Sequence, residues 1–322
     1  MDLRKGEAVW LDPHGLGPGP YTMSYGFDLD VLCTSIRKAG LIHPPWVARN
    51  QQGSFDIVSG YRRVLALKAL GERDVPCRDM SESLASPWER FLAAFYENLA
   101  TRKFNEIEKA MVLHNAGAYV DQEEIMDSFM PLLSLPSHEG TLKLYLKLLN
   151  LEENVQSTIA AGRIPMTAVK ALVEMEKKDR QAVFHWIAEL NLNLNQQLKL
   201  IEYIKDISMR EEISDWEVLS DPPVVAVGEN PRLNKPQKSK ALLETLRARR
   251  SPRLAQAQQA VESAVSAISL PHGISIRYDS YLEDPYYQLE VRFRDGKELR
   301  SAVTKLHEVH ELEALPELWP GK

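Results

Sequence analysis

The pattern of apolar and polar positions divides the chain into an alternating N-terminal part and a longer helical part. Up to about residue 95, short apolar runs typical of strands alternate with residues spaced as on one face of a helix. Strands are predicted at Glu7–Leu11, Trp46–Arg49, Phe55–Val58 and Val75–Arg78, and helices after Asp28 and Gly60. From Trp88 to Glu212 apolar residues recur every three or four positions, with Pro and Gly breaks between them. This order predicts a small mixed α/β domain followed by a helical bundle.

The C-terminal part returns to a mixed pattern. Helices are predicted at Leu254–Ile268 and Ala302–Leu312, and strands between them at Ile274–Tyr278 and Gln288–Phe293. Before this module, Asp221–Lys240 is rich in Pro, Asn and Lys, as linkers are. We therefore predict a multidomain α+β protein with boundaries at 1–95, 96–220, a basic linker at 221–253, and an α-β-β-α module at 254–322. A strand pair flanked by two helices has little core of its own, so we expect this module to form a homodimer.

Composition narrows the class of protein. The chain has 322 residues, 44% of them hydrophobic, and only two cysteines, too few for a disulfide framework. No apolar run approaches the roughly 18–20 residues that cross a bilayer, and the first residues lack the apolar core of a signal peptide. We expect a cytoplasmic protein without a membrane segment. The net charge of −6 hides one basic stretch: residues 232–253 contain eight Lys or Arg against Glu244 alone. Such a stretch is either a solvated linker or a contact for a polyanion.

The first segment with chemical character is Phe55–Gly71, in which a strand runs through Ser59 and Gly60 into a helix that begins with two arginines. The unpaired N–H groups and the dipole of a helix N-terminus attract anions, and glycine lets an anion approach the backbone closely. Arg62 and Arg63 add forked donors suited to phosphate. The segment predicts an anion site; the alternative is a helix start whose arginines pair with neighbouring carboxylates.

The second such segment is residues 96–110. Glu97 and Asn98 offer adjacent side-chain oxygens, a ligand pair suited to a Mg²⁺ ion that also holds substrate phosphates. Asn105 and Glu108 have the spacing of a helix-capping box, which we interpret as purely structural. Taken alone, the segment fits a polar junction between helices equally well.

Together, the segments resemble the N-terminal half of ParB-type partition proteins. The order GLIHPP, IVSGYRRVLALKALG, VPC and ENL…N.IEKA is similar to that family's GLxQPI, IVxGERRxRA, VPxxV and ENxxRxxxNPIEEA boxes. The similarity continues through LKLLNLEENVQSTIAAGRIPMTAVKALVEM, and covers about residues 7–175. The resemblance implies a ParB/sulfiredoxin-like domain that binds CTP with Mg²⁺, a central helical DNA-binding domain with a helix-turn-helix, and a clamp-forming dimer that acts in chromosome or plasmid partition. A ParA-like ATPase is an implied partner, and the implied location is the nucleoid.

The resemblance also implies roles for individual residues. The residues implied to bind the nucleotide are Gly60, Tyr61, Arg62, Arg63, Asn98 and Arg102. Glu97 and Asn98 would hold Mg²⁺, and Glu97 would support a slow hydrolysis of CTP, which the sequence leaves undecided. Two positions depart from the family pattern: Tyr61 replaces the usual Glu, and Thr101 stands where the ENxxR box has Arg.

DNA contacts are expected on two segments. In the candidate recognition helix Ser137–Leu149, Lys143 and Lys147 lie four apart on one face, and Thr141 and Tyr145 on another. The helix is unusually apolar, so an ordinary bundle helix is the alternative. The basic stretch adds Arg247, Arg249 and Arg250 as salt-dependent phosphate contacts.

Two other functions stay open. One is an enzyme on the same fold, such as a nucleotide-dependent kinase or a nuclease. The other is a nucleotide-sensing adaptor that binds a protein and no DNA, which the overall acidity favours.

Overall fold

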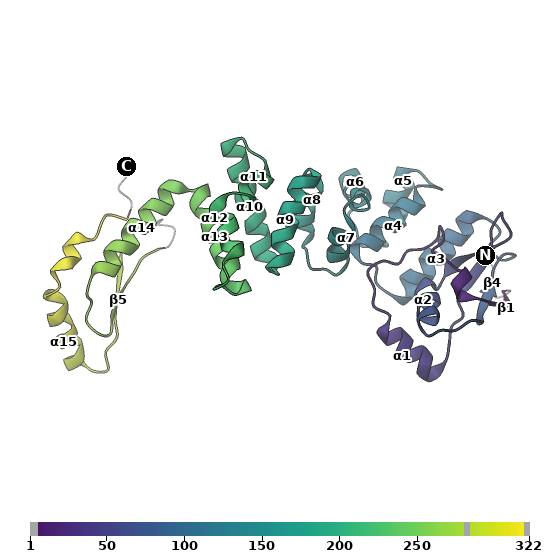
Figure 1. Cartoon of the computed structure of the whole chain (residues 1–322), viewed down its shortest axis with the longest axis horizontal. Helices are drawn as coiled ribbons and strands as arrows, with labels where there is room; N and C mark the ends of the chain where they lie inside the picture. Colours follow the sequence, from purple (N-terminus) through teal and green to yellow (C-terminus); the bar gives the residue numbers. More distant parts are fainter. Residues whose placement is uncertain (1–5, 280–283, 319–322) are drawn as a thin grey trace. The chain divides into compact units, whose positions relative to one another are not determined.

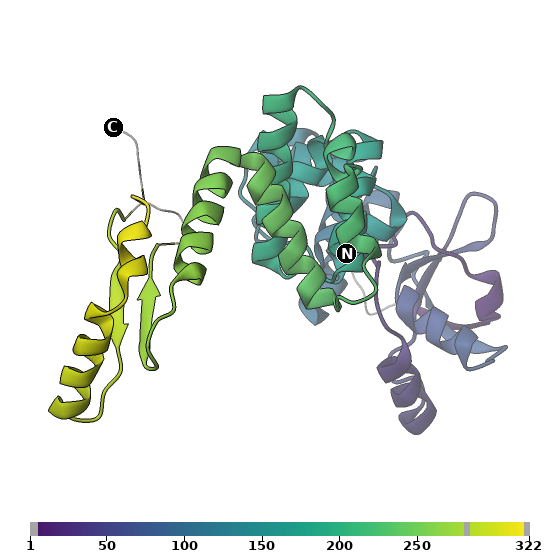
Figure 2. The ribbon, with the colours of Figure 1, turned by 60° about the vertical axis from the view of Figure 1, so that its left-hand side comes forward.

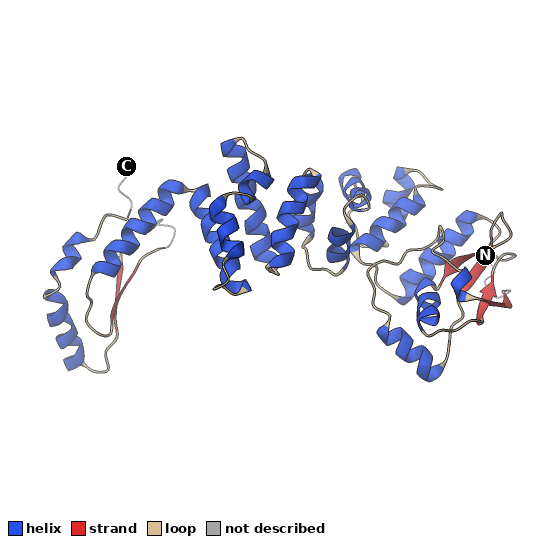
Figure 3. Ribbon diagram, in the orientation of Figure 1, coloured by secondary structure: helices blue, strands red, loops and turns tan. Residues whose placement is uncertain are grey.

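The computed structural model describes residues 6–279 and 284–318, and it separates into two compact units, Met1–Glu176 and Lys177–Lys322. Strands lie toward the two ends of the sequence, and the described chain between them is helical (Figures 1 and 3). The predicted multidomain α+β class is confirmed. The unit boundary differs from the predicted ones because the helices of residues 87–174 belong to the same unit as the N-terminal sheet.

The first unit begins with a four-stranded sheet. Its elements, in chain order, are β1 (Glu7–Leu11), a 3₁₀ turn (Pro13–Gly15), α1 (Asp30–Ala39), β2 (Trp46–Arg49), β3 (Phe55–Ser59), α2 (Tyr61–Ala69) and β4 (Val75–Asp79). The strand order is β1-β4-β2-β3, with β2 parallel to β4 and the other two pairs antiparallel. Strand β3 is therefore an edge strand, and the turn that follows it leads into α2.

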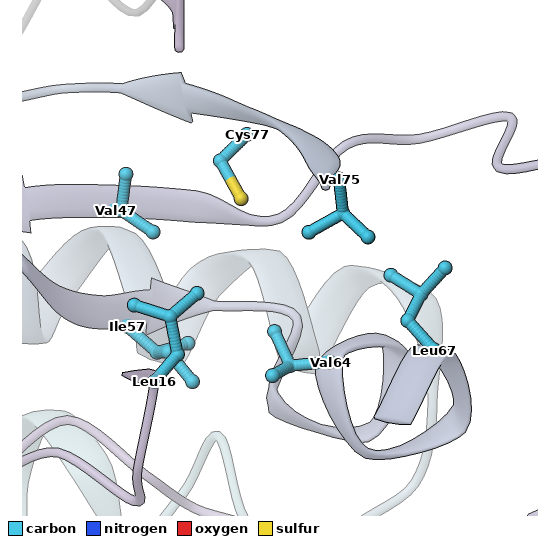
Figure 4. Close-up of a cluster of buried hydrophobic side chains, with 7 residues drawn as sticks. All are labelled: Leu16, Val47, Ile57, Val64, Leu67, Val75 and Cys77. Carbon is cyan, nitrogen blue, oxygen red and sulfur yellow. The ribbon is translucent and has the colours of Figure 1, made fainter. Parts of the chain in front are cut away.

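A small apolar core holds α2 against this sheet. Its buried members are Leu16, Val47, Ile57, Val64, Leu67, Val75 and Cys77 (Figure 4). Val64 and Leu67 are three residues apart and therefore lie on the same face of α2, toward the strands. The core thus fixes the start of α2, where the predicted anion site lies.

The remainder of the first unit is helical. It comprises α3 (Pro87–Thr101), α4 (Glu106–Ala116), α5 (Gln122–Glu124), a π-helical turn (Ile125–Phe129), α6 (Glu139–Leu148), α7 (Glu153–Ala160) and α8 (Met166–Glu174). Helix α3 packs on β3, and its aromatic side chains Phe91 and Phe95 contact Phe129. Capping boxes fix the starts of both α3 and α4. The C-terminal end of α3 is therefore held next to the turn at Ser59 and Gly60, between β3 and α2.

The second unit contains α9 (Lys177–Glu189), α10 (Leu194–Glu211), α11 (Asp215–Leu219), α12 (Pro222–Glu229), α13 (Lys235–Arg250), α14 (Pro252–Ala267), β5 (Ile274–Arg277), β6 (Gln288–Val291), α15 (Gly296–His307) and a 3₁₀ turn (His310–Ala314). Helix α14, the antiparallel β5–β6 pair and α15 give the predicted α-β-β-α order (Figure 2). In the described part of the chain, no helix is long and apolar enough to cross a membrane.

The structure corrects the predicted linker at 221–253. This stretch forms α12 and α13, and α13 packs on α10 through the buried side chains of Leu242 and Leu246. Pro222, Pro223 and Pro236 stand in the first turns of these two helices, where the missing N–H group costs little. The basic stretch is therefore a packed helix.

Candidate functional site

A cavity of about 540 Å³ lies where the end of β3, the start of α2 and the end of α3 meet. This volume falls within the roughly 300–1,000 Å³ of small-molecule sites. Its lining includes all of the residues predicted for nucleotide and metal binding, namely Gly60, Tyr61, Arg62, Arg63, Glu97, Asn98 and Arg102. The loop Tyr21–Ser24, Ser59, His43 and Arg78 also line it. The fold thus brings together two segments that are more than thirty residues apart in the sequence.

The turn into α2 requires glycine. Gly60 has φ = 95°, in the left-handed region, and a Cβ atom there would lie 3.0 Å from Nε and Nη2 of Arg63. In the described chain no side chain caps this helix, and its first turn contains no acidic residue. The N–H groups at the start of α2 therefore suit an anion. Its two arginines pair with carboxylates, as the alternative interpretation of the segment expects: Arg62 with Glu108 and Arg63 with Glu97.

Glu97 faces this turn from α3. Arg63 Nη2 donates a hydrogen bond to Glu97 Oε1 at 3.1 Å, and Ser59 Oγ donates to Oε2 at 2.6 Å. Arg63 Nη1 is held in turn by the carbonyl of His43 at 2.8 Å. The two contacts fix the Glu97 carboxylate at the cavity wall, beside the place where an anion would lie.

A buried carboxylate stands behind the cavity. Glu108 is 1% exposed, and it pairs with Arg62 Nη2 and Arg102 Nη1, each at 2.6 Å. The expected capping box with Asn105 is present. The sequence interpretation of Glu108 as purely structural therefore misses its two arginine partners. A signal existed, because Val112 lies four residues further along α4 and is buried, so Glu108 belongs to the buried face of that helix.

The guanidinium of Arg102 bonds several partners within the protein. Its Nε donates to Asn98 Oδ1 at 2.8 Å, Nη1 pairs with Glu108, and Nη2 donates to the carbonyl of Met23 at 2.5 Å. Burial lowers the pKa of Arg102 from its ordinary value, although the nearby Glu108 opposes this effect. A guanidinium has five N–H donors, so Arg102 can keep these bonds and still make the expected contact with a nucleotide. Thr101 is exposed and its hydroxyl donates to the carbonyl of Glu97 at 2.8 Å.

The donor set suits a magnesium ion only in part. Within residues 6–279 and 284–318, no group of three or more His, Cys, Asp or Glu side chains could hold a metal. Magnesium bound to a nucleotide needs only one or two carboxylates, because phosphate and water supply the other ligands. The carboxylate of Glu97 has lone pairs to spare beside its two hydrogen bonds. Asn98 Oδ1 already accepts a bond from Arg102, so Glu97 fits the role better than Asn98.

The predicted recognition helix, now α6, is divided between a buried and an exposed face. Tyr145 is buried, and its hydroxyl donates to the carboxylate of Glu106 on α4, so it does not face DNA as predicted. Thr141 is half-buried and its N–H donates to the ring of His138 at 3.1 Å. Lys143 and Lys147 are exposed, and they pair with Glu139 at 2.5 Å and Glu174 at 2.8 Å. The two lysines are the members of the predicted set that lie at the surface.

The three arginines predicted to bind DNA in the basic stretch have partners within the second unit. Arg249 bonds Glu211 at 2.6 Å and Asp221 at 3.1 Å, and Arg250 bonds Asp206 at 2.6 Å. Arg247 also has an interaction partner within the fold. Because carboxylates of neighbouring segments compensate this charge, the excess of basic residues in the sequence overstates the positive surface.

Comparison with known protein families assigns two segments. Residues 6–85 match the ParB N-terminal domain and residues 134–206 match the ParB HTH domain. The second match crosses the boundary between the two units.

Individual proteins agree with this assignment. The chain is 28% identical over 213 residues to a probable chromosome-partitioning protein ParB of Campylobacter jejuni, covering 64% of this chain and 72% of that one. It is 26% identical to a nucleoid occlusion protein of Geobacillus thermodenitrificans, covering 81% and 79%. A truncated Caulobacter crescentus ParB crystallised with CTP-γ-S is 21% identical, covers 53% of this chain and 94% of that one, and has a TM-score of 0.27.

Proposed function

The chain belongs to the ParB family of partition proteins, and from that premise we propose that it is a CTP-dependent DNA-binding protein acting in chromosome or plasmid partition or a related regulatory task. The observation that carries the nucleotide part is the Gly60 turn. It joins an uncapped helix start, Arg62, Arg63 and the carboxylate of Glu97 at one cavity. A triphosphate would accept hydrogen bonds from the N–H groups of this uncapped helix start, and the cavity provides room for the nucleoside.

In this proposal, the residues have separate tasks. The N–H groups at the start of α2 and the guanidinium of Arg63 bind phosphate oxygens. Glu97 would hold Mg²⁺, which supplies charge neutralisation at the phosphates when it is bound. A slow hydrolysis of CTP is part of the proposal, with Glu97 orienting the attacking water.

Calorimetric titration of the full chain tests the nucleotide part. We expect saturable binding of CTP with Mg²⁺, weaker binding of ATP, GTP and UTP, and loss of binding in Arg63→Ala. Arg49→Ala is the matched control, because Arg49 is an exposed arginine outside the cavity lining. Unchanged CTP affinity in Arg63→Ala would refute the assignment of the turn.

For DNA binding, the support is the match to the ParB HTH domain together with the exposed Lys143 and Lys147 on α6. If these lysines bind phosphates, Lys143→Gln with Lys147→Gln lowers the salt slope of DNA affinity by roughly two units, about one per lost contact. Arg249→Gln is the control, because the Arg249 side chain is only 24% exposed and bonds two carboxylates, whereas the two lysines are exposed. An unchanged slope in the lysine variant would exclude this face.

A nucleotide-responsive adaptor that binds protein and no DNA is the second candidate. Two observations favour it: Tyr145 is buried, and Arg249 and Arg250 are ion-paired. It predicts CTP binding without any salt-sensitive affinity for duplex DNA, so the two titrations above distinguish the candidates.

We also propose a homodimer through the C-terminal module. Helix α15 has no buried residue in the described chain, and its Val303 is 55% exposed. Leu289 of β6 and the following Phe293 are also exposed apolar side chains, at 46% and 50%. Sedimentation analysis would show a dimer that Val303→Glu weakens. A monomeric wild-type chain would refute the proposal. A ParA-like ATPase remains a proposed partner on the family resemblance alone.

A further inference from the structure

The guanidinium of Arg62 is held on two sides. Its Nη2 donates to Glu108 Oε1 at 2.6 Å, and its face lies over the ring of Phe27 with 4.5 Å between Cζ and the ring centre. Among the described residues, no acceptor pairs with its buried Nε. An unpaired buried donor costs free energy, so the fold maintains this orientation against a penalty. Such a cost at the wall of a cavity points to a functional constraint.

The same carboxylate also holds the part of the cavity wall that Arg102 and the loop at Met23 form. Glu108 Oε2 pairs with Arg102, whose Nη2 donates to the carbonyl of Met23. The N–H of Tyr25 donates directly to Glu108 Oε1 at 3.1 Å. The turn, the end of α3 and the loop before α1 are therefore joined through one buried side chain, which itself does not line the cavity.

We propose that Glu108 is a positioning residue for the phosphate-binding part of this cavity, an inference that rests on the proposed nucleotide function. It fixes the direction of Arg62 before the ligand arrives and, through Arg102, holds the loop at Met23 as a wall. Preorganising a charged donor removes the ordering cost that the ligand would otherwise meet. The contribution of Glu108 therefore depends on the number of phosphates in the ligand.

The test compares wild type with Glu108→Gln in titrations with CTP, CMP and inorganic tripolyphosphate. Glutamine can take the same place in a capping box, so the start of α4 is retained while the charge is lost. We expect affinity for CTP and tripolyphosphate to fall about tenfold, the lower end of what losing an orienting partner costs a metal ligand. Affinity for CMP changes much less. Adding Glu108→Gln to Arg62→Ala causes a smaller loss than in wild type, because only the contacts through Arg102 and the loop are left for Glu108 to hold.

Glu106→Gln is the matched control. Glu106 lies in the same helical turn and pairs with Lys109 and Tyr145, outside the cavity lining. We expect its nucleotide affinities to equal those of wild type. Glu108→Asp keeps the charge but shortens the side chain, so the aspartate cannot reach both arginines. This variant replaces Glu108→Gln if the glutamine variant does not fold. We expect it to show the same selective loss of affinity for CTP and tripolyphosphate.

Each other outcome overturns the inference. Equal weakening for CTP and CMP would show a merely structural role, and tighter CTP binding would show that Glu108 competes with the ligand for Arg62. Both outcomes leave the proposed nucleotide function intact. If wild type binds neither CTP nor tripolyphosphate, the proposed function fails, and the inference fails with it.

Discussion

Replacing Gly60 by alanine tests whether the backbone of the turn positions the anion site. Gly60 has φ = 95°, and an alanine Cβ would lie 3.0 Å from the guanidinium nitrogens of Arg63 and 3.1 Å from its Cζ. An alanine at this position must therefore adopt a strained backbone conformation, and its Cβ must displace the side chain of Arg63. Because Arg63 bonds both Glu97 and the carbonyl of His43, this displacement disrupts the cavity wall.

The magnitude follows from the two effects separately. A left-handed conformation costs an L-residue roughly 1–2 kcal/mol. For a unit of this size, that lowers the melting temperature by roughly 2–8 °C. The displacement of Arg63 adds a loss of CTP affinity that we expect to approach that of Arg63→Ala.

Gly53→Ala is the matched control in this experiment. Gly53 has φ = 82° in the turn between β2 and β3, with no atom within 4 Å of the added Cβ in the described structure. We expect a similar fall in melting temperature, measured by calorimetry on the full chain, and no change in CTP affinity. Equal CTP affinity in Gly60→Ala and wild type would refute the reasoning, as would a large loss in Gly53→Ala.

Three further predictions concern the packed parts of both units. Burial raises the pKa of Cys77 to about 11, so a thiol reagent should label the half-exposed Cys33 first; equal labelling rates in the native protein would contradict this. Burial, helped by the adjacent Glu106, raises the pKa of Tyr145 above its ordinary value near 10, so the stability it contributes is present below about pH 10 and is lost at higher pH. Denaturant titrations should show a weaker alkaline loss in Tyr145→Phe, and an unchanged pH profile would refute the contact. Arg249→Ala should destabilise the second unit by roughly 1 kcal/mol at low salt and less at high salt; a salt-independent effect would argue against its ion pairs.

Local pattern was sufficient for most of the N-terminal sheet. The bounds of β1 and β2 agree with the prediction, and β3 and β4 each extend one residue further. The last helix, predicted at Ala302–Leu312, begins at Gly296 and ends at His307. Its start depends on a cap, because Asp295 accepts bonds from the N–H groups of Lys297 and Glu298.

The remaining errors arise from tertiary contacts. Helices α12 and α13 have polar, proline-containing starts that resemble a linker, and only packing against α10 shows Leu242 and Leu246 to be core residues. Likewise, the spacing of Tyr145 along its helix suits either a DNA-facing or a buried side chain, and the position of Glu106 on another helix decides between them. The turn at Gly60 could be predicted because glycine at a strand-to-helix junction is a local signal, whereas its use as an anion site stays a prediction.

The most direct test of the central claim is a crystal structure of the full chain grown with CTP and Mg²⁺. The account predicts that the phosphates lie at the start of α2, within hydrogen-bond distance of the N–H groups after Gly60 and of Arg63, with the metal on Glu97. Nucleotide bound elsewhere, or phosphates that contact neither the turn nor Arg63, would contradict it.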